Sequence, residues 1–68
     1  MSEIKLRIQD KTGHSECVLQ QEQALERAQE LEQKGYYMVY LDGQGNPQSK
    51  FVSGETQTID AISGIRGG

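Results

Sequence analysis

The chain has 68 residues, of which 34% are hydrophobic and 25% are charged, and its formal net charge is −3. This length allows one small domain with a single core, and the acidic balance argues against a nucleic-acid-binding protein, which normally presents a basic face. No apolar run reaches the ~20 residues of a membrane-spanning helix, and residues 1–3 lack a signal-peptide pattern, so we expect a soluble cytoplasmic protein.

The N-terminal third of the sequence predicts a β-hairpin. Ile4, Leu6 and Ile8 alternate with polar residues, which is the pattern of a half-buried strand. Residues 10–13 read Asp-Lys-Thr-Gly and predict a turn, because aspartate can hydrogen-bond its own backbone and glycine allows positive φ. Residues 15–19 then predict a shorter second strand that pairs with the first.

Residues 22–34 predict a single helix that ends at Gly35, since glycine supplies the left-handed conformation that terminates many helices. The apolar side chains of this stretch share one face at helical spacing, and the other positions are Glu, Gln, Arg and Lys. We expect Leu25 and Leu31 to be core residues. The apolar stripe consists of Ala24, Leu25, Ala28 and Leu31.

The C-terminal half predicts further strands. Residues 36–41 are apolar on both faces, which indicates a central strand. Residues 42–47 are dense in turn formers, and residues 49–53 predict a short returning strand. The β-branched residues in 56–62 predict a last strand.

The elements follow in the order β-β-α-β-β, with four or five strands in total. This order predicts the α+β class, with one helix packed on a mixed sheet. We expect residues 1–63 to form a single domain. Residues 64–68 contain three glycines, so we expect a flexible C-terminal tail.

The tyrosines are candidate binding residues. Tyr36 and Tyr40 share one face of the predicted central strand, and Tyr37 shares the other with Val39 and Leu41. One face meets the helix, and an exposed aromatic face usually marks a partner surface. Tyr36, Tyr37 and Tyr40 are therefore candidate partner-binding residues. Coverage by the sheet's own long side chains and self-association through the sheet remain alternatives.

The sequence does not place a pair of groups for nucleophilic or acid–base catalysis, so we expect no enzymatic activity. Cys17 is the single cysteine and lies in a predicted strand, where free cysteine behaves as a small buried hydrophobe. His14 is the single histidine, and we expect it to be a solvated turn residue. We expect neither a metal site nor a cofactor.

The element order and the final residues Ile65-Arg66-Gly67-Gly68 resemble the ubiquitin-like β-grasp family. The resemblance covers most of the chain as element order and, as residues, little beyond the tail. It implies that a partner adenylating enzyme activates the Gly68 carboxylate. The activated Gly68 then forms an isopeptide bond to a lysine, or becomes a thiocarboxylate that delivers sulfur.

We therefore expect a small ubiquitin-like modifier or carrier with Arg66, Gly67 and Gly68 as its activation tail. Glycines without Cβ let the backbone lie extended in a narrow channel, and Arg66 can pair with an acidic wall there. The alternative is a small adaptor or regulatory module that binds a protein through its sheet and has an inert tail.

Overall fold

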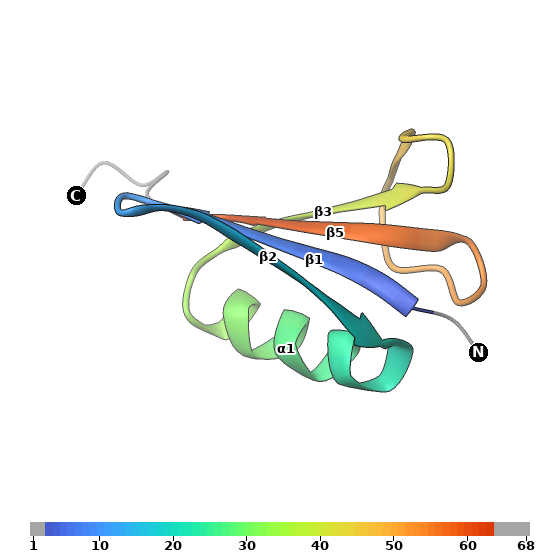
Figure 1. The fold of residues 1–68 in the computed structure, drawn as a ribbon, viewed down its shortest axis with the longest axis horizontal. Helices are drawn as coiled ribbons and strands as arrows, with labels where there is room; N and C mark the ends of the chain where they lie inside the picture. The colour runs from blue at the N-terminus through green and yellow to red at the C-terminus, as the bar shows by residue number, and fades with distance from the viewer. Residues whose placement is uncertain (1–2, 64–68) are drawn as a thin grey trace.

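The computed structural model describes residues 3–63, in which one helix packs on a five-stranded mixed sheet (Figure 1). The predicted α+β class and the β-β-α-β-β order are confirmed, with a further strand at the end of the domain. Within this part of the chain, no helix has the length and apolar character needed to cross a membrane. The elements are β1 (Glu3–Asp10), β2 (Gly13–Gln20), α1 (Gln21–Gln33), β3 (Tyr37–Asp42), β4 (Pro47–Gln48) and β5 (Thr56–Ile62).

The strands lie in the order β2-β1-β5-β3-β4. β1 and β5 are parallel neighbours at the centre, and the other neighbouring pairs are antiparallel. A parallel pair needs a long crossover connection, and the segment from β2 to β4, which includes α1, provides it. This topology is consistent with a β-grasp. The predicted tail over 64–68 lies outside the described residues.

The predicted hairpin is confirmed, and its strands are longer than predicted. β1 and β2 pair without interruption from Glu3 opposite Gln20 to Asp10 opposite Gly13. The Asp10 carboxylate accepts hydrogen bonds from the Thr12 hydroxyl at 2.7 Å and the Thr12 amide at 2.9 Å. This aspartate turn fixes the tight connection, and Gly13 takes the positive φ of 131° that follows it.

As predicted, Gly35 terminates the helix, and its φ is 97°. The Gly35 amide donates to the Glu32 carbonyl, and the Tyr36 amide donates to the Leu31 carbonyl, each at 3.0 Å. These two bonds form a Schellman motif, which satisfies carbonyls at the end of the helix. Because Tyr36 packs against the core directly after this motif, the helix end is fixed relative to the start of β3.

The core lies between α1 and one face of the sheet. Leu31 is a core residue as predicted, but Leu25 is only half-buried and lies outside the core cluster. Leu25 is adjacent in sequence to buried Ala24, which places it about 100° around the helix, on the flank of the stripe. The buried cluster consists of Ile4, Leu6, Ala24, Ala28, Leu31, Ile59 and Ala61.

The predicted strand over 49–53 is wrong, because the returning strand is the two-residue β4. The Val52 carbonyl accepts hydrogen bonds from the Glu55 and Thr56 amides, at 3.0 and 2.9 Å. The Val52 amide in turn donates to the Thr56 hydroxyl at 2.9 Å. The segment therefore folds as a turn, and it directs Phe51 against the core rather than into a ladder.

Candidate functional site

The strand register divides the side chains between two faces of the sheet. Leu6 lies opposite Ile59 and Tyr40 also lies opposite Ile59, so these residues share the face that α1 covers. Arg7 lies opposite Asp60, and Asp60 lies opposite Val39, on the other side. We call this second side the open face, because α1 packs on the opposite side of the sheet (Figure 1).

An ion pair lies at the centre of the open face. Arg7 Nε donates to Asp60 Oδ1 at 2.6 Å, and Arg7 Nη2 donates to Asp60 Oδ2 at 2.8 Å. The Asp60 side chain is 13% exposed, and that of Arg7 is 37% exposed. The hydrogen bonds from Arg7 to Asp60 and the negative charge of Asp60 raise the pKa of the Arg7 guanidinium. This bidentate geometry locks both side chains and links β1 to β5.

Apolar side chains form a strip beside this ion pair, on β3 and the end of β5. Tyr37 lies opposite Ile62, and Val39 and Leu41 follow along the same face of β3. Tyr37 is 63% exposed, and the other three side chains are half-buried. We call Tyr37, Val39, Leu41 and Ile62 the open-face strip. Exposed apolar strips of this kind are typical of protein-contact surfaces.

The structure separates the three predicted tyrosines. Tyr37 lies on the open face and is accessible. Tyr40 points to the helix face and makes an edge-to-face contact with Phe51, with ring centroids 6.3 Å apart. Burial, and then the charge of Glu32, raise the pKa of Tyr40. Tyr36 lies just before β3 and packs against the core. Of the three, Tyr37 is therefore the one positioned for contact with a partner.

The predicted burial of Cys17 is wrong, whereas the predicted solvent exposure of His14 is confirmed. Cys17 is exposed, because it lies on β2 at the edge of the sheet, and no other strand of residues 3–63 lies on its outer side. His14 is exposed but belongs to β2 rather than to the turn. Cys17 lies opposite Leu6 on the helix face, whereas His14 lies opposite Gln9 on the open face. The two side chains therefore point to opposite sides of the sheet.

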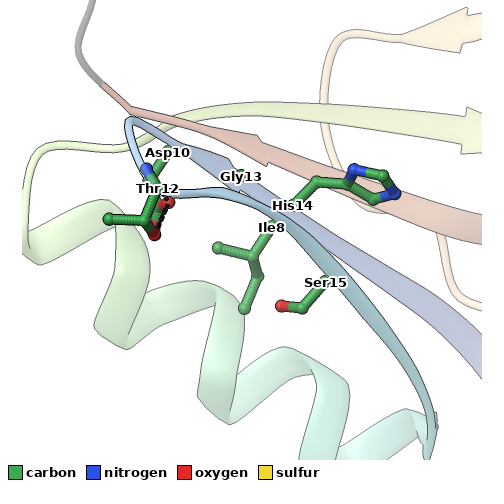
Figure 2. Close-up of a pocket in the computed structure, with 6 residues that line it drawn as sticks. All are labelled: Ile8, Asp10, Thr12, Gly13, His14 and Ser15. Atoms are coloured by element: carbon green, nitrogen blue, oxygen red, sulfur yellow. Dashed lines mark hydrogen bonds between the residues drawn. The ribbon is translucent and has the colours of Figure 1, made fainter.

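A small pocket of about 110 Å³ lies at the β1–β2 turn (Figure 2). Figure 2 shows Ile8 and Ser15 extending toward the helix side, while His14 extends to the other side. The Asp10 carboxylate at its rim is occupied by its two hydrogen bonds to Thr12, which lower the pKa of Asp10. Asp10 and Thr12, two of the polar residues that line this pocket, therefore serve the turn.

A wider pocket of about 350 Å³ lies between the β3–β4 turn and the start of β5. Asp42 Oδ1 accepts hydrogen bonds from the backbone amides of Asn46 and Gln44, both at 2.9 Å. These bonds lower the pKa of Asp42. Within residues 3–63, no three His, Cys, Asp or Glu side chains gather in a way that could hold a metal ion. Two carboxylates line this pocket. That of Asp42 is thus a turn-forming group, and that of Glu55 accepts a hydrogen bond from Gln48 Nε2 at 3.3 Å.

The sequence did not predict the Arg7–Asp60 ion pair, and it did not predict that Ile62 belongs to the open-face strip. Alternation along β1 and β5 could have assigned each side chain to a face. It could not have shown that β1 and β5 are neighbours, because that pairing joins residues 53 positions apart. Arg66, Gly67 and Gly68, the predicted activation tail, lie outside the described residues. No family model, curated protein or solved structure matches the chain.

Proposed function

We propose that this protein is a ubiquitin-like modifier or carrier whose Gly68 carboxylate is activated by a partner adenylating enzyme. The strand order and single helix, which are consistent with a β-grasp, support the proposal. The observation that carries it is the sequence Arg66-Gly67-Gly68 after such a domain. Fold alone would not suffice, because one fold can host many functions.

The proposed chemistry is activation of an acyl group. A carboxylate is a poor electrophile, so an oxygen of Gly68 attacks the α-phosphorus of ATP and pyrophosphate leaves. A lysine amine or a sulfur nucleophile then attacks the acyl carbon, and AMP leaves. In the amine case the nitrogen loses a proton as the amide forms. The partner supplies ATP and the nucleophile, and this protein supplies the carboxylate.

The residue types of the tail suit this role. Gly67 and Gly68 have no Cβ, so a narrow channel can hold their backbone extended without a steric clash. Arg66 carries a permanent charge and a planar set of donors, which fit acidic groups at a channel entrance.

A second candidate function is favoured by the open-face strip. Tyr37 is 63% exposed and continues into half-buried Val39, Leu41 and Ile62. Tyrosine suits such a surface because its ring offers apolar area while its hydroxyl remains hydrated. In this alternative the protein is an adaptor that binds a protein partner through the open face, and its tail is inert.

The experiment that tests the proposal compares the wild-type chain, Gly68→Ala, and a chain with one residue added after Gly68. Intact mass of the protein from its natural source first establishes whether the mature chain ends at Gly68. Each version is then incubated with ATP and extract from the same source. Mass spectrometry measures Gly-Gly remnants on lysines, which trypsin leaves after cleaving at Arg66, or a thiocarboxylate at Gly68.

We expect adducts with the wild-type chain and none with either variant, while all three melt at the same temperature. The modifier proposal is wrong if no adduct forms with any version, or if the natural chain continues past Gly68 without processing. The adaptor function would then be favoured if Tyr37→Ser, and not Gly68→Ala, disrupts the cellular role.

A further inference from the structure

The two edges of the sheet differ in how they are protected. β4 has two residues and begins with Pro47, which has no amide to offer another strand. β2 has eight residues, of sequence GHSECVLQ, with neither proline nor lysine, and it pairs with β1 without a register shift. Long, regular edges of this kind are templates for another strand, and most proteins protect them. Within residues 3–63, no strand pairs with the outer edge of β2.

The backbone groups that β2 presents at this edge follow from the pairing of β1. The Gln9 carbonyl accepts the Ser63 amide at 2.9 Å, so the polar backbone groups of Gln9 point toward β5. His14, opposite Gln9, is therefore in a non-hydrogen-bonded pair and directs its own amide and carbonyl outward. Hydrogen-bonded and non-hydrogen-bonded pairs alternate along an antiparallel ladder. The backbone amides and carbonyls of every second residue after His14 therefore also point outward, namely those of Glu16, Val18 and Gln20.

We propose that this edge pairs with β2 of a second copy of the chain, antiparallel and across a two-fold axis perpendicular to the sheet. Such an axis keeps both helices on the same side of one continuous sheet. It also requires that one residue of β2 lie opposite its own counterpart. Only a register centred on a single residue keeps the helix-face and open-face side chains on their proper sides.

The side chains of β2 select the register. A centre at Glu16 would place two carboxylates directly opposite each other, which is destabilising. A centre at Val18 would pair only residues 16–20. A centre at Cys17 pairs residues 14–20 along their whole length, with Glu16 opposite Val18 and His14 opposite Gln20. All the outward-pointing amides and carbonyls then form hydrogen-bonded pairs.

The charge on this edge is compatible with a second copy. Glu16 is the only charged side chain of β2 in the neutral-histidine state. It lies opposite Arg7 in the register, and Lys5 Nζ is 3.9 Å from its carboxylate. Val18, 58% exposed in the single chain, would gain cover from the stem of Glu16 in the second copy. Pairing of β2 with β2 of a second copy therefore places no like charges opposite each other and buries some apolar surface.

The contact is one strand wide, so we expect a reversible, concentration-dependent dimer in the size class below ~1,200 Å². It does not depend on the tail chemistry, because the proposed pairing is between residues 14–20 of the two copies.

The first experiment uses Cys17 as a reporter of register. In the proposed dimer, Cys17 and its counterpart form a non-hydrogen-bonded pair with Cα atoms about 4.5 Å apart, within the ~4.4–6.8 Å range of disulfides. Copper(II)–phenanthroline accepts one electron from each thiol as the S–S bond forms and two protons leave. We expect rapid formation of a covalent dimer that dithiothreitol reverses.

The matched control moves the thiol along the same face, in the variant Cys17→Ser/Ser15→Cys. Its thiols would lie about 14 Å apart along the strand, so we expect cross-linking at least ~10-fold slower. Equal rates for the two proteins would show random collision and overturn the proposal.

The second experiment removes one outward amide. Val18→Pro deletes the backbone amide of residue 18, which makes no hydrogen bond to β1. Val18→Ala keeps this amide but, like Val18→Pro, removes the valine side chain. Sedimentation equilibrium of the full chains should show a concentration-dependent mass for wild type and Val18→Ala, and a constant monomer mass for Val18→Pro. Wild type that stays monomeric at every concentration overturns the proposal, even if Val18→Pro fails to fold. Dimerisation of a folded Val18→Pro overturns it as well.

Discussion

The two faces of the sheet differ in how deeply their side chains are buried. On the helix face, Ile4, Leu6 and Ile59 are completely buried. On the open face, the central residues are the Arg7–Asp60 pair, and Tyr37 is 63% exposed. Burial of apolar surface is the main driving force of folding, so the helix face stabilises the domain. The open face contributes less to stability and is available for contacts. Within residues 3–63, the one helix covers only one face of the sheet.

The largest expected effect is a cavity beneath the helix. Leu31→Ala should lower the free energy of unfolding by ~2–5 kcal/mol, because Leu31 is 4% exposed within the core cluster. Domains of this kind have only about 5–15 kcal/mol in total. Urea denaturation at constant pH measures the loss.

Leu25→Ala is the matched control, since the substitution is the same on the same helix. Leu25 is half-buried and outside the core cluster, so its loss should be clearly smaller than that of Leu31. Equal losses, or a loss below about 1 kcal/mol for Leu31→Ala, would contradict the packing of α1 described here.

A smaller effect is expected from the ion pair on the open face. A double-mutant cycle with Arg7→Met and Asp60→Ala should give a coupling energy of about 1 kcal/mol, at the upper end for exposed pairs. The bidentate geometry and the burial of Asp60 strengthen the pair, while exposure of Arg7 lets solvent screen it. Urea denaturation of the four proteins measures the coupling. If the losses in unfolding free energy of the two single variants add up to that of the double variant, the ion pair does not stabilise the fold.

The sequence predicted the features that local pattern controls. Alternation of Ile4, Leu6 and Ile8 indicated β1, and β-branched residues gave β5 the bounds that the structure has, Thr56–Ile62. The helix was predicted to within a residue at each end, because Gly35 marks its end. These elements depend on spacing, capping and turn residues, which lie close together in the chain.

Features that depend on strand neighbours were not predictable in the same way. Cys17 was expected to be buried, but β2 is an edge strand and leaves it exposed. Phe51 suggested a strand, yet hydrogen bonds between Val52 and Thr56 form a turn directly after it. The candidate site depends on the same kind of pairing, since only the sheet order shows that Tyr37 lies beside Ile62. Sheet order is set by long-range pairing, which a single sequence does not display.

Acid should weaken the turns at the ends of the strands. The pKa of Asp42 is lowered by hydrogen bonds from the backbone amides of Asn46 and Gln44. A carboxyl whose pKa is lower in the folded chain stabilises it above the unfolded pKa of about 3.9, and this contribution is lost as pH falls through the folded value. Urea midpoints should therefore fall below about pH 4, and less steeply in Asp42→Asn.

Asp10→Asn should behave in the same way, because hydrogen bonds from the Thr12 hydroxyl and amide lower the pKa of Asp10. Curves of midpoint against pH that run parallel for wild type and both variants would contradict a role of these turn carboxylates in acid sensitivity.

The smallest effect on stability is expected on the open-face strip, where a pair of tyrosines separates folding from binding. Tyr37→Ala should change the free energy of unfolding by no more than about 0.5 kcal/mol, because the side chain is mostly exposed. Tyr40→Ala removes the same atoms from the helix face, where the ring contacts Phe51, and should cost about 2 kcal/mol. Urea denaturation gives both values.

A protein recovered in complex with the wild-type chain is then titrated against both variants by calorimetry. If the open face is the contact surface, Tyr37→Ala loses affinity although it is as stable as wild type, and Tyr40→Ala keeps its affinity at temperatures where it remains folded. The reverse result would assign the contact to the helix side of the molecule and would remove Tyr37 from the proposed surface.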